Sequence, residues 1–202
     1  MEAAALEHGH HEHHGPPEAH RSSRVDHRTL GMLLFIISEI MVFGAFFTAY
    51  FFIRVVQGAE WPAEGEHLPK VIAGVNTAIL ISSSFTMHWA LVSIKRDRRF
   101  GLIAGLFLTL AMGLTFLSLQ IHEYLNLSFT PSNNAFASGF FSLTGLHGMH
   151  VFVGATLLAI AFIRACRGHY SGAEHIGLEV TGLYWHFVDV VWILLYTVVY
   201  LL

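Results

Sequence analysis

The chain has 202 residues, of which 54% are hydrophobic and only 12% are charged. Soluble domains carry roughly a quarter charged residues, so this composition excludes an ordinary soluble protein and predicts an integral membrane protein. The formal net charge of -3 provides no excess of positive charge with which to bind nucleic acid.

The first 28 residues contain no apolar run, but they hold seven of the fifteen histidines of the chain. We expect residues 1–28 to form a disordered, His-rich cytoplasmic tail, because this segment has no apolar face to bury. Metal binding by the tract is the alternative, although its irregular spacing encodes no fixed coordination geometry. We expect no cleavable secretory signal, so the first apolar span would direct membrane insertion.

Five long apolar stretches follow the tail. Each is about as long as the roughly 20 residues that a helix needs to cross a bilayer core. They cover approximately residues 30–53, 71–94, 100–121, 139–163 and 177–201. The predicted fold class is therefore an all-α integral membrane protein, with one domain of five transmembrane helices over residues 29–202.

The lysines and arginines are distributed unequally between the two sides of the predicted membrane. Nine of the eleven lie before the first span, between the second and third, or after the fourth, and the exceptions are Arg54 and Lys70. Basic flanks are retained on the cytoplasmic side. This pattern predicts a cytoplasmic N-terminus and a C-terminus on the outside.

Glu39 is the only ionisable residue in an otherwise apolar stretch, LLFIISEIMVFGAFF, at residues 33–47. A charged side chain at the bilayer centre costs roughly 2.5–3.5 kcal/mol on insertion scales. We therefore expect Glu39 to face the inside of the bundle rather than lipid.

Polar residues also recur at helical spacing in three later spans, so that each set shares one face of its helix. The sets are Thr109, Gly113, Phe116, Gln120 and Glu123; His147, His150 and Gly154; and Glu179, Gly182, His186 and Asp189. Polar groups cannot remain unsatisfied in hydrocarbon, so we expect these faces to meet inside the bundle. Gly145 and Gly148 are expected to allow two helices to approach closely.

Three interpretations of these polar faces compete. In the first, His147, His150, His186 and the carboxylates bind a metal or haem, but Glu123 and Glu179 are expected near opposite membrane faces and cannot share one coordination shell. In the second, Glu39, His186 and Asp189 form the proton relay of a transporter or channel. In the third, which we favour, the groups are hydrogen-bonded packing contacts of a non-catalytic bundle, and no residue binds a metal.

Several motifs together resemble subunit III of the haem-copper respiratory oxidases, in its short five-helix bacterial form. The resemblance covers residues 30–202 in unbroken order, and its motifs are LLFIISEIMVFGAFF, NTAILISSSFTMHWA, FLSLQIHEYLNLSFTPS, FFSLTGLHGMHVFVGATLL and GLYWHFVDVVWILLYTVVYL. The resemblance implies an accessory subunit, without a redox centre of its own, of a proton-pumping cytochrome c oxidase in the bacterial inner membrane. The haems and copper would belong to partner subunits I and II, with subunit I in direct contact.

The resemblance also implies roles for individual residues. Glu39 matches the buried glutamate of the family, which faces the bundle and a lipid-filled cleft. Arg164 and Arg167, in FIRACRGHY, match a segment whose basic residues meet phospholipid head groups, and an arginine fork suits phosphate. Thr48 stands where longer relatives often have Trp, and the two helices that form the other wall of the cleft are missing.

The family role includes support of proton uptake at the cytoplasmic face, where the histidine-rich tail is also expected. The imidazoles of the tail exchange protons readily near neutral pH, so the tail is a candidate proton collector. The sequence does not identify the electron donor, and subunit III of a quinol oxidase is the alternative within the family. A proton-coupled membrane transporter is the alternative from a different class.

Overall fold

The computed structural model describes residues 26–57 and 68–202, and most of these residues lie in long helices. The helices are α1 (His27–Gln57), α2 (Lys70–Lys95), α3 (Arg99–Asn126), α4 (Ala135–Cys166) and α5 (Ile176–Tyr196), and α5 continues into the π-helical turn η2 (Thr197–Leu201). The first four predicted spans lie inside α1 to α4, and the fifth lies inside α5 together with η2. The five-helix prediction is therefore confirmed. The first helix begins at His27, two residues before the predicted boundary, and residues 1–25 of the predicted tail lie outside the described residues.

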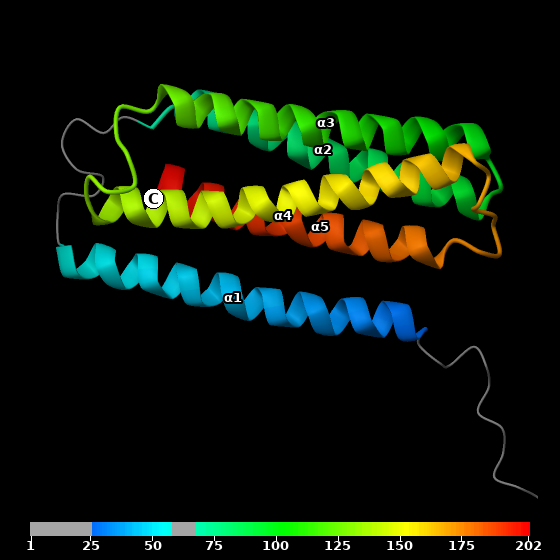
Figure 1. Cartoon of the computed structure of the whole chain (residues 1–202), viewed down its shortest axis with the longest axis horizontal. Helices are drawn as coiled ribbons and strands as arrows, with labels where there is room; N and C mark the ends of the chain where they lie inside the picture. Colours follow the sequence, from blue (N-terminus) through cyan, green and yellow to red (C-terminus); the bar gives the residue numbers. More distant parts are fainter. Residues whose placement is uncertain (1–25, 58–67) are drawn as a thin grey trace, which may run out of the picture.

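Each helix is long enough to cross a membrane. The shortest candidate spans have 26 residues, which corresponds to about 39 Å at the helical rise, against a bilayer core of about 30 Å. Helices α2, α3, α4 and α5 form a four-helix bundle, and α1 packs outside it against α4 and α5 (Figure 1). The start of α1 and the C-terminus lie at opposite ends of the bundle (Figure 1).

Helix α1 is attached through a narrow stripe. Its buried apolar residues are Ile36, Phe43 and Tyr50, which are spaced seven residues apart. Only 11% of its most apolar window is buried inside the protein, against 56% for α5. The remaining surface of α1 is therefore available to lipid or to a partner protein.

Two tryptophans of α5 connect this helix to α2 in the bundle centre. Trp185 Nε1 donates a hydrogen bond to Ser83 Oγ (2.9 Å), and Trp192 Nε1 donates to Thr77 Oγ1 (2.9 Å). Both indole rings are fully buried. Satisfying the indole N–H groups inside the bundle allows these large rings to fill its core.

The close approach of helices occurs at different glycines from those predicted. A Cβ atom at Gly113 would lie 2.6 Å from the Trp185 ring, and one at Gly154 would lie 2.9 Å from the same ring. At Gly148, by contrast, a Cβ would meet nothing within 4 Å, and at Gly145 only the Tyr124 hydroxyl at 3.9 Å. The prediction for Gly145 and Gly148 is therefore wrong, because these two residues line a shallow groove between α3 and α4 rather than a helix crossing.

Candidate functional site

Glu39 contacts a histidine of a neighbouring helix. Its Oε2 lies 3.0 Å from His150 Nε2, which joins α1 to α4. Their side chains are 17% and 10% exposed, so the pair is largely shielded by the bundle. Phe43 covers the imidazole, with ring centres 4.9 Å apart, and the Tyr184 hydroxyl donates to the carbonyl of His150 (3.2 Å).

The second nitrogen of His150 determines how this pair holds its proton. His150 Nδ1 lies 2.8 Å from the carbonyl oxygen of Leu146, and because a carbonyl can only accept, Nδ1 must carry a proton. One further proton then lies between Nε2 and the Glu39 carboxylate. Whether it is bound to oxygen or to nitrogen, the pair as a whole is neutral, which suits its depth in the membrane.

A second polar group lies between α2 and α5. Ser84 Oγ donates a short hydrogen bond to Asp189 Oδ2 and lies 3.0 Å from His186 Nδ1. A hydroxyl donates only once, so with the proton of Ser84 given to Asp189, His186 Nδ1–H donates to Ser84. Asp189 is 4% exposed, His186 is half-buried, and His88, one turn beyond Ser84 on α2, is exposed.

This group contains a serine, a histidine and an aspartate, but its order does not fit acyl-transfer chemistry. In a catalytic triad the imidazole lies between the hydroxyl and the carboxylate and takes the proton of the hydroxyl. Here the Ser84 hydroxyl lies between the imidazole of His186 and the carboxylate of Asp189. The arrangement instead holds two helices together and presents an imidazole at their seam.

His147 lies in the bundle centre, away from both polar groups. Its ring is fully buried and packs against Trp192 (centres 4.8 Å apart) and edge-on against Phe116 (5.7 Å). Among the described residues, neither ring nitrogen has a hydrogen-bond partner. His147 and His150 both point inward, as predicted, but toward different neighbours.

Glu123, near the end of α3, is held by the C-terminal turn of the chain. The Tyr200 hydroxyl donates to Glu123 Oε1 at 2.8 Å, and Glu123 is 5% exposed. Gln120, one turn earlier, is 4% exposed. The predicted inward face of α3 is confirmed, since Thr109, Gly113 and Phe116 are also buried.

Glu179 lies at the other end of the bundle and is partly exposed. Its Oε1 is 2.7 Å from Lys95 Nζ and 3.3 Å from His175 Nε2. Glu179 and Glu123 thus lie at opposite ends of the bundle, as predicted. Within residues 26–57 and 68–202, no three His, Cys, Asp or Glu side chains are grouped closely enough to hold a metal ion.

Arg164 and Arg167 lie at the end of α4, and both are exposed. The Arg164 guanidinium carbon lies 5.4 Å from the centre of the Tyr170 ring, in the connection to α5. Burial raises the pKa of Tyr170, and the nearby Arg164 guanidinium opposes that shift. Both arginines are therefore accessible at this end of the bundle.

The partners of the predicted residues were not found by sequence reasoning. The cost of a charge in lipid identified Glu39 as inward-facing, and periodicity identified Glu123 and Asp189. Neither argument indicated the residues opposite them, which are His150, Tyr200 and Ser84. The pairing of Glu123 with Tyr200 had one usable signal, because both lie near span ends predicted on the same membrane side.

Comparisons with known proteins identify the same protein family by two routes, a family model and individual relatives. The family model described as "Cytochrome c oxidase subunit III" matches residues 16–202. The chain is 43% identical over 184 residues to cytochrome c oxidase subunit 3 of Thermostichus vulcanus, covering 91% of each chain. It is 45% identical over 194 residues to the subunit 3 of a Synechocystis species (95% of this chain, 79% of the relative). It is 40% identical over 176 residues to the horse (Equus caballus) protein (84% and 67%).

Proposed function

Because the chain belongs to the cytochrome c oxidase subunit III family, we propose that it is the colourless accessory subunit of an oxidase that pumps protons. In this proposal the chain carries no redox centre, and the haems and copper are held by subunits I and II. Its work is to dock on subunit I, to stabilise it, to hold phospholipid and to support proton uptake.

The observation that carries the docking role is a polar surface at mid-span. His88 is exposed and His186 is half-buried, and both are within about 8 Å of the middle of their helices at the helical rise. Ionisable side chains at this depth normally face protein or a wet cavity rather than lipid. The seam between α2 and α5 therefore supports a contact with a transmembrane helix of subunit I.

Replacing His88 with leucine tests this contact. A leucine facing lipid is harmless, whereas a leucine facing a polar group of subunit I removes an interhelical hydrogen bond worth up to about 1.7 kcal/mol. We expect the amount of this chain retained per haem, after detergent purification of the tagged oxidase, to fall roughly tenfold. The control is Leu114→Ala on α3, which is 50% exposed and should be retained like the unchanged chain.

Unchanged retention of the His88→Leu chain would contradict docking at this seam. The wider proposal fails on a different outcome of the same purification. A chain that enriches without any haem absorbance, and that moves protons alone in liposomes, would be a transporter rather than an oxidase subunit.

Phospholipid binding is the second proposed role, at the end of α4. Its support is the exposure of Arg164 and Arg167 and the fit of a planar guanidinium to phosphate. We expect the variant Arg164→Gln/Arg167→Gln to retain several-fold less anionic phospholipid in the purified complex, measured by lipid mass spectrometry. If the double variant and the unchanged chain retained equal amounts of anionic phospholipid, the proposed lipid-binding role of Arg164 and Arg167 would be refuted.

Proton uptake is the third proposed role, and it depends on orientation. The excess of basic residues supports a cytoplasmic N-terminus and an outside C-terminus in a bacterial inner membrane. The histidine-rich segment within residues 1–25 would then lie where protons enter subunit I. Deleting residues 1–20 and measuring turnover between about pH 6 and pH 8.5 tests this role, and unchanged turnover would refute it.

A further inference from the structure

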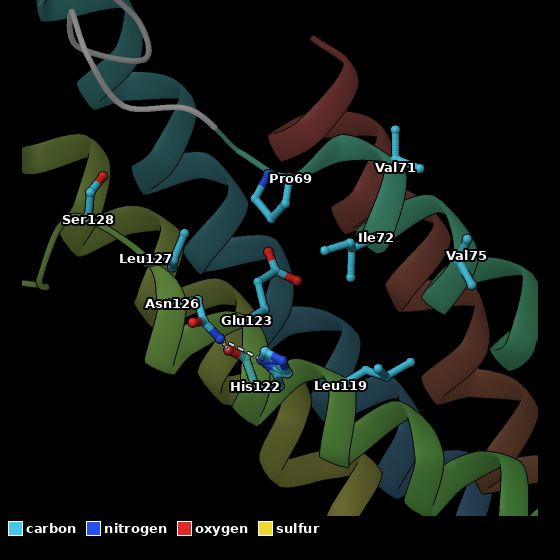
Figure 2. Close-up of a pocket in the computed structure, with 10 residues that line it drawn as sticks. All are labelled: Pro69, Val71, Ile72, Val75, Leu119, His122, Glu123, Asn126, Leu127 and Ser128. Carbon is cyan, nitrogen blue, oxygen red and sulfur yellow. Dashed lines mark hydrogen bonds between the residues drawn. The ribbon is translucent and has the colours of Figure 1, made fainter.

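A cavity opens between the first turns of α2 and the last turns of α3, and no role proposed above uses it. Its volume is about 520 Å³, within the usual range of roughly 300–1,000 Å³ for small-molecule sites. Figure 2 shows Pro69, Ile72 and Val75 on one side and Leu119, Glu123 and Leu127 on the other. It lies at the end of the bundle opposite Arg164 and Arg167.

The cavity contains one buried hydrogen-bond acceptor that is left free. Glu123 is 5% exposed, and its Oε1 is occupied by the Tyr200 hydroxyl. Its Oε2 is buried and has no hydrogen-bond partner among the described residues. Figure 2 shows this carboxyl group directed into the space between α2 and α3. A buried carboxyl oxygen without a hydrogen-bond partner costs free energy, and a donor that entered the cavity would remove this cost.

A second polar group lies at the mouth of the cavity. His122 is exposed, and its Nδ1 lies 2.5 Å from the amide nitrogen of Asn126. An amide nitrogen donates, so Nδ1 is the acceptor and the proton of the neutral ring is on Nε2. The cavity therefore offers an acceptor for a cation inside and a donor for an anion at its rim.

The remaining lining is apolar and faces outward. Val71, Ile72 and Val75 are 80%, 50% and 54% exposed on the surface of α2, where a transmembrane helix meets acyl chains. A molecule that satisfies all three regions has a hydrogen-bonding cation, an adjacent anion and an apolar body. A phospholipid with a primary amine in its head group has this order of groups.

We propose that this cavity binds an aminophospholipid, whose ammonium group donates to Glu123 Oε2. Its phosphate accepts from His122, and its acyl chains lie along Val71, Ile72 and Val75. The amine is the specific element, because a trimethylated head group has no N–H to donate and a glycerol head group has no positive charge.

The test measures lipid retained by the whole purified oxidase. The complex is exchanged in detergent with equal amounts of phosphatidylethanolamine, phosphatidylcholine and phosphatidylglycerol, and bound lipid is counted by native mass spectrometry. We expect phosphatidylethanolamine to be retained in preference to the other two. Glu123→Gln should lower its retention roughly tenfold, because the amide keeps an oxygen for Tyr200 but replaces the free acceptor with a donor.

Two further variants separate this site from unspecific effects. Glu179→Gln removes a carboxylate at the other end of the bundle and should leave the preference unchanged. Val75→Trp places a bulky ring in the cavity and leaves Glu123 itself unchanged, and it should lower retention as Glu123→Gln does. The proposal is overturned if Glu123→Gln binds like the unchanged chain, if Glu179→Gln has the same effect, or if phosphatidylcholine or phosphatidylglycerol is retained equally well.

Discussion

Replacing Trp185 with alanine is expected to lower the free energy of unfolding by about 3 kcal/mol, at the lower end of the range for buried tryptophans. The ring is fully buried, and it fills the space that Gly113 and Gly154 leave open on two facing helices. Its removal creates a cavity and breaks the hydrogen bond to Ser83. We expect a loss of unfolding free energy at the lower end of this range because the surrounding lipid is as apolar as the protein core. Lost packing contacts, rather than a hydrophobic effect, then account for most of the destabilisation.

The measurement is unfolding of the isolated chain in mixed detergent micelles, followed by tryptophan fluorescence. Trp89→Ala is the matched control, since this side chain is 44% exposed on α2 and its loss leaves no internal cavity. A change below about 0.5 kcal/mol is expected for the control, as for surface substitutions in general. Equal losses in the two variants would contradict the central position of Trp185.

Replacing Glu39 with leucine is expected to cost about 1–3 kcal/mol, because His150 Nε2 then has no partner inside the bundle. Glu39→Gln should be far less harmful. With the proton of His150 held at Nδ1 by the Leu146 carbonyl, Nε2 of the neutral ring accepts, and a glutamine amide donates to it. A carboxyl group and an amide are thus interchangeable at this position, whereas an apolar side chain is not.

A double-mutant cycle with His150→Leu isolates the pair itself. The interaction energy between Glu39 and His150 is expected near 1 kcal/mol, as for other polar contacts between transmembrane helices. The double variant should therefore be more stable than the sum of the two single losses predicts. An interaction energy of zero would mean that the two side chains do not hold α1 on the bundle.

The sequence predicted the helices and the direction of their polar faces because both follow from periodicity along one chain. Residues three or four apart on α3 and α5 lie on the same side of any helix, whatever surrounds it. Gln120, Glu123 and Asp189 therefore turned out to be buried. Their burial could be predicted without knowing which helix lies opposite.

Neighbour relations between helices could not be predicted in the same way. The position of α1 outside the four-helix bundle depends on side-chain packing across helices, so His150 was not predicted as the partner of Glu39. The glycines illustrate the same limit. Gly145, Gly148 and Gly154 have similar sequence surroundings, but only Gly154 faces the Trp185 ring.

The narrow apolar stripe that attaches α1 to the bundle does not by itself define the axial position of this helix. Ile36, Phe43 and Tyr50 repeat every seven residues, so a displacement of α1 by one repeat would keep apolar side chains at two of the three contact positions and place Thr29 or Gln57 at the third. The same displacement would bring Met32 or Phe46 opposite His150, and neither can share a proton with it. The contact between Glu39 and His150 therefore adds little to the binding strength of α1. Its effect is to favour one axial position of this helix over positions that apolar packing alone discriminates only weakly.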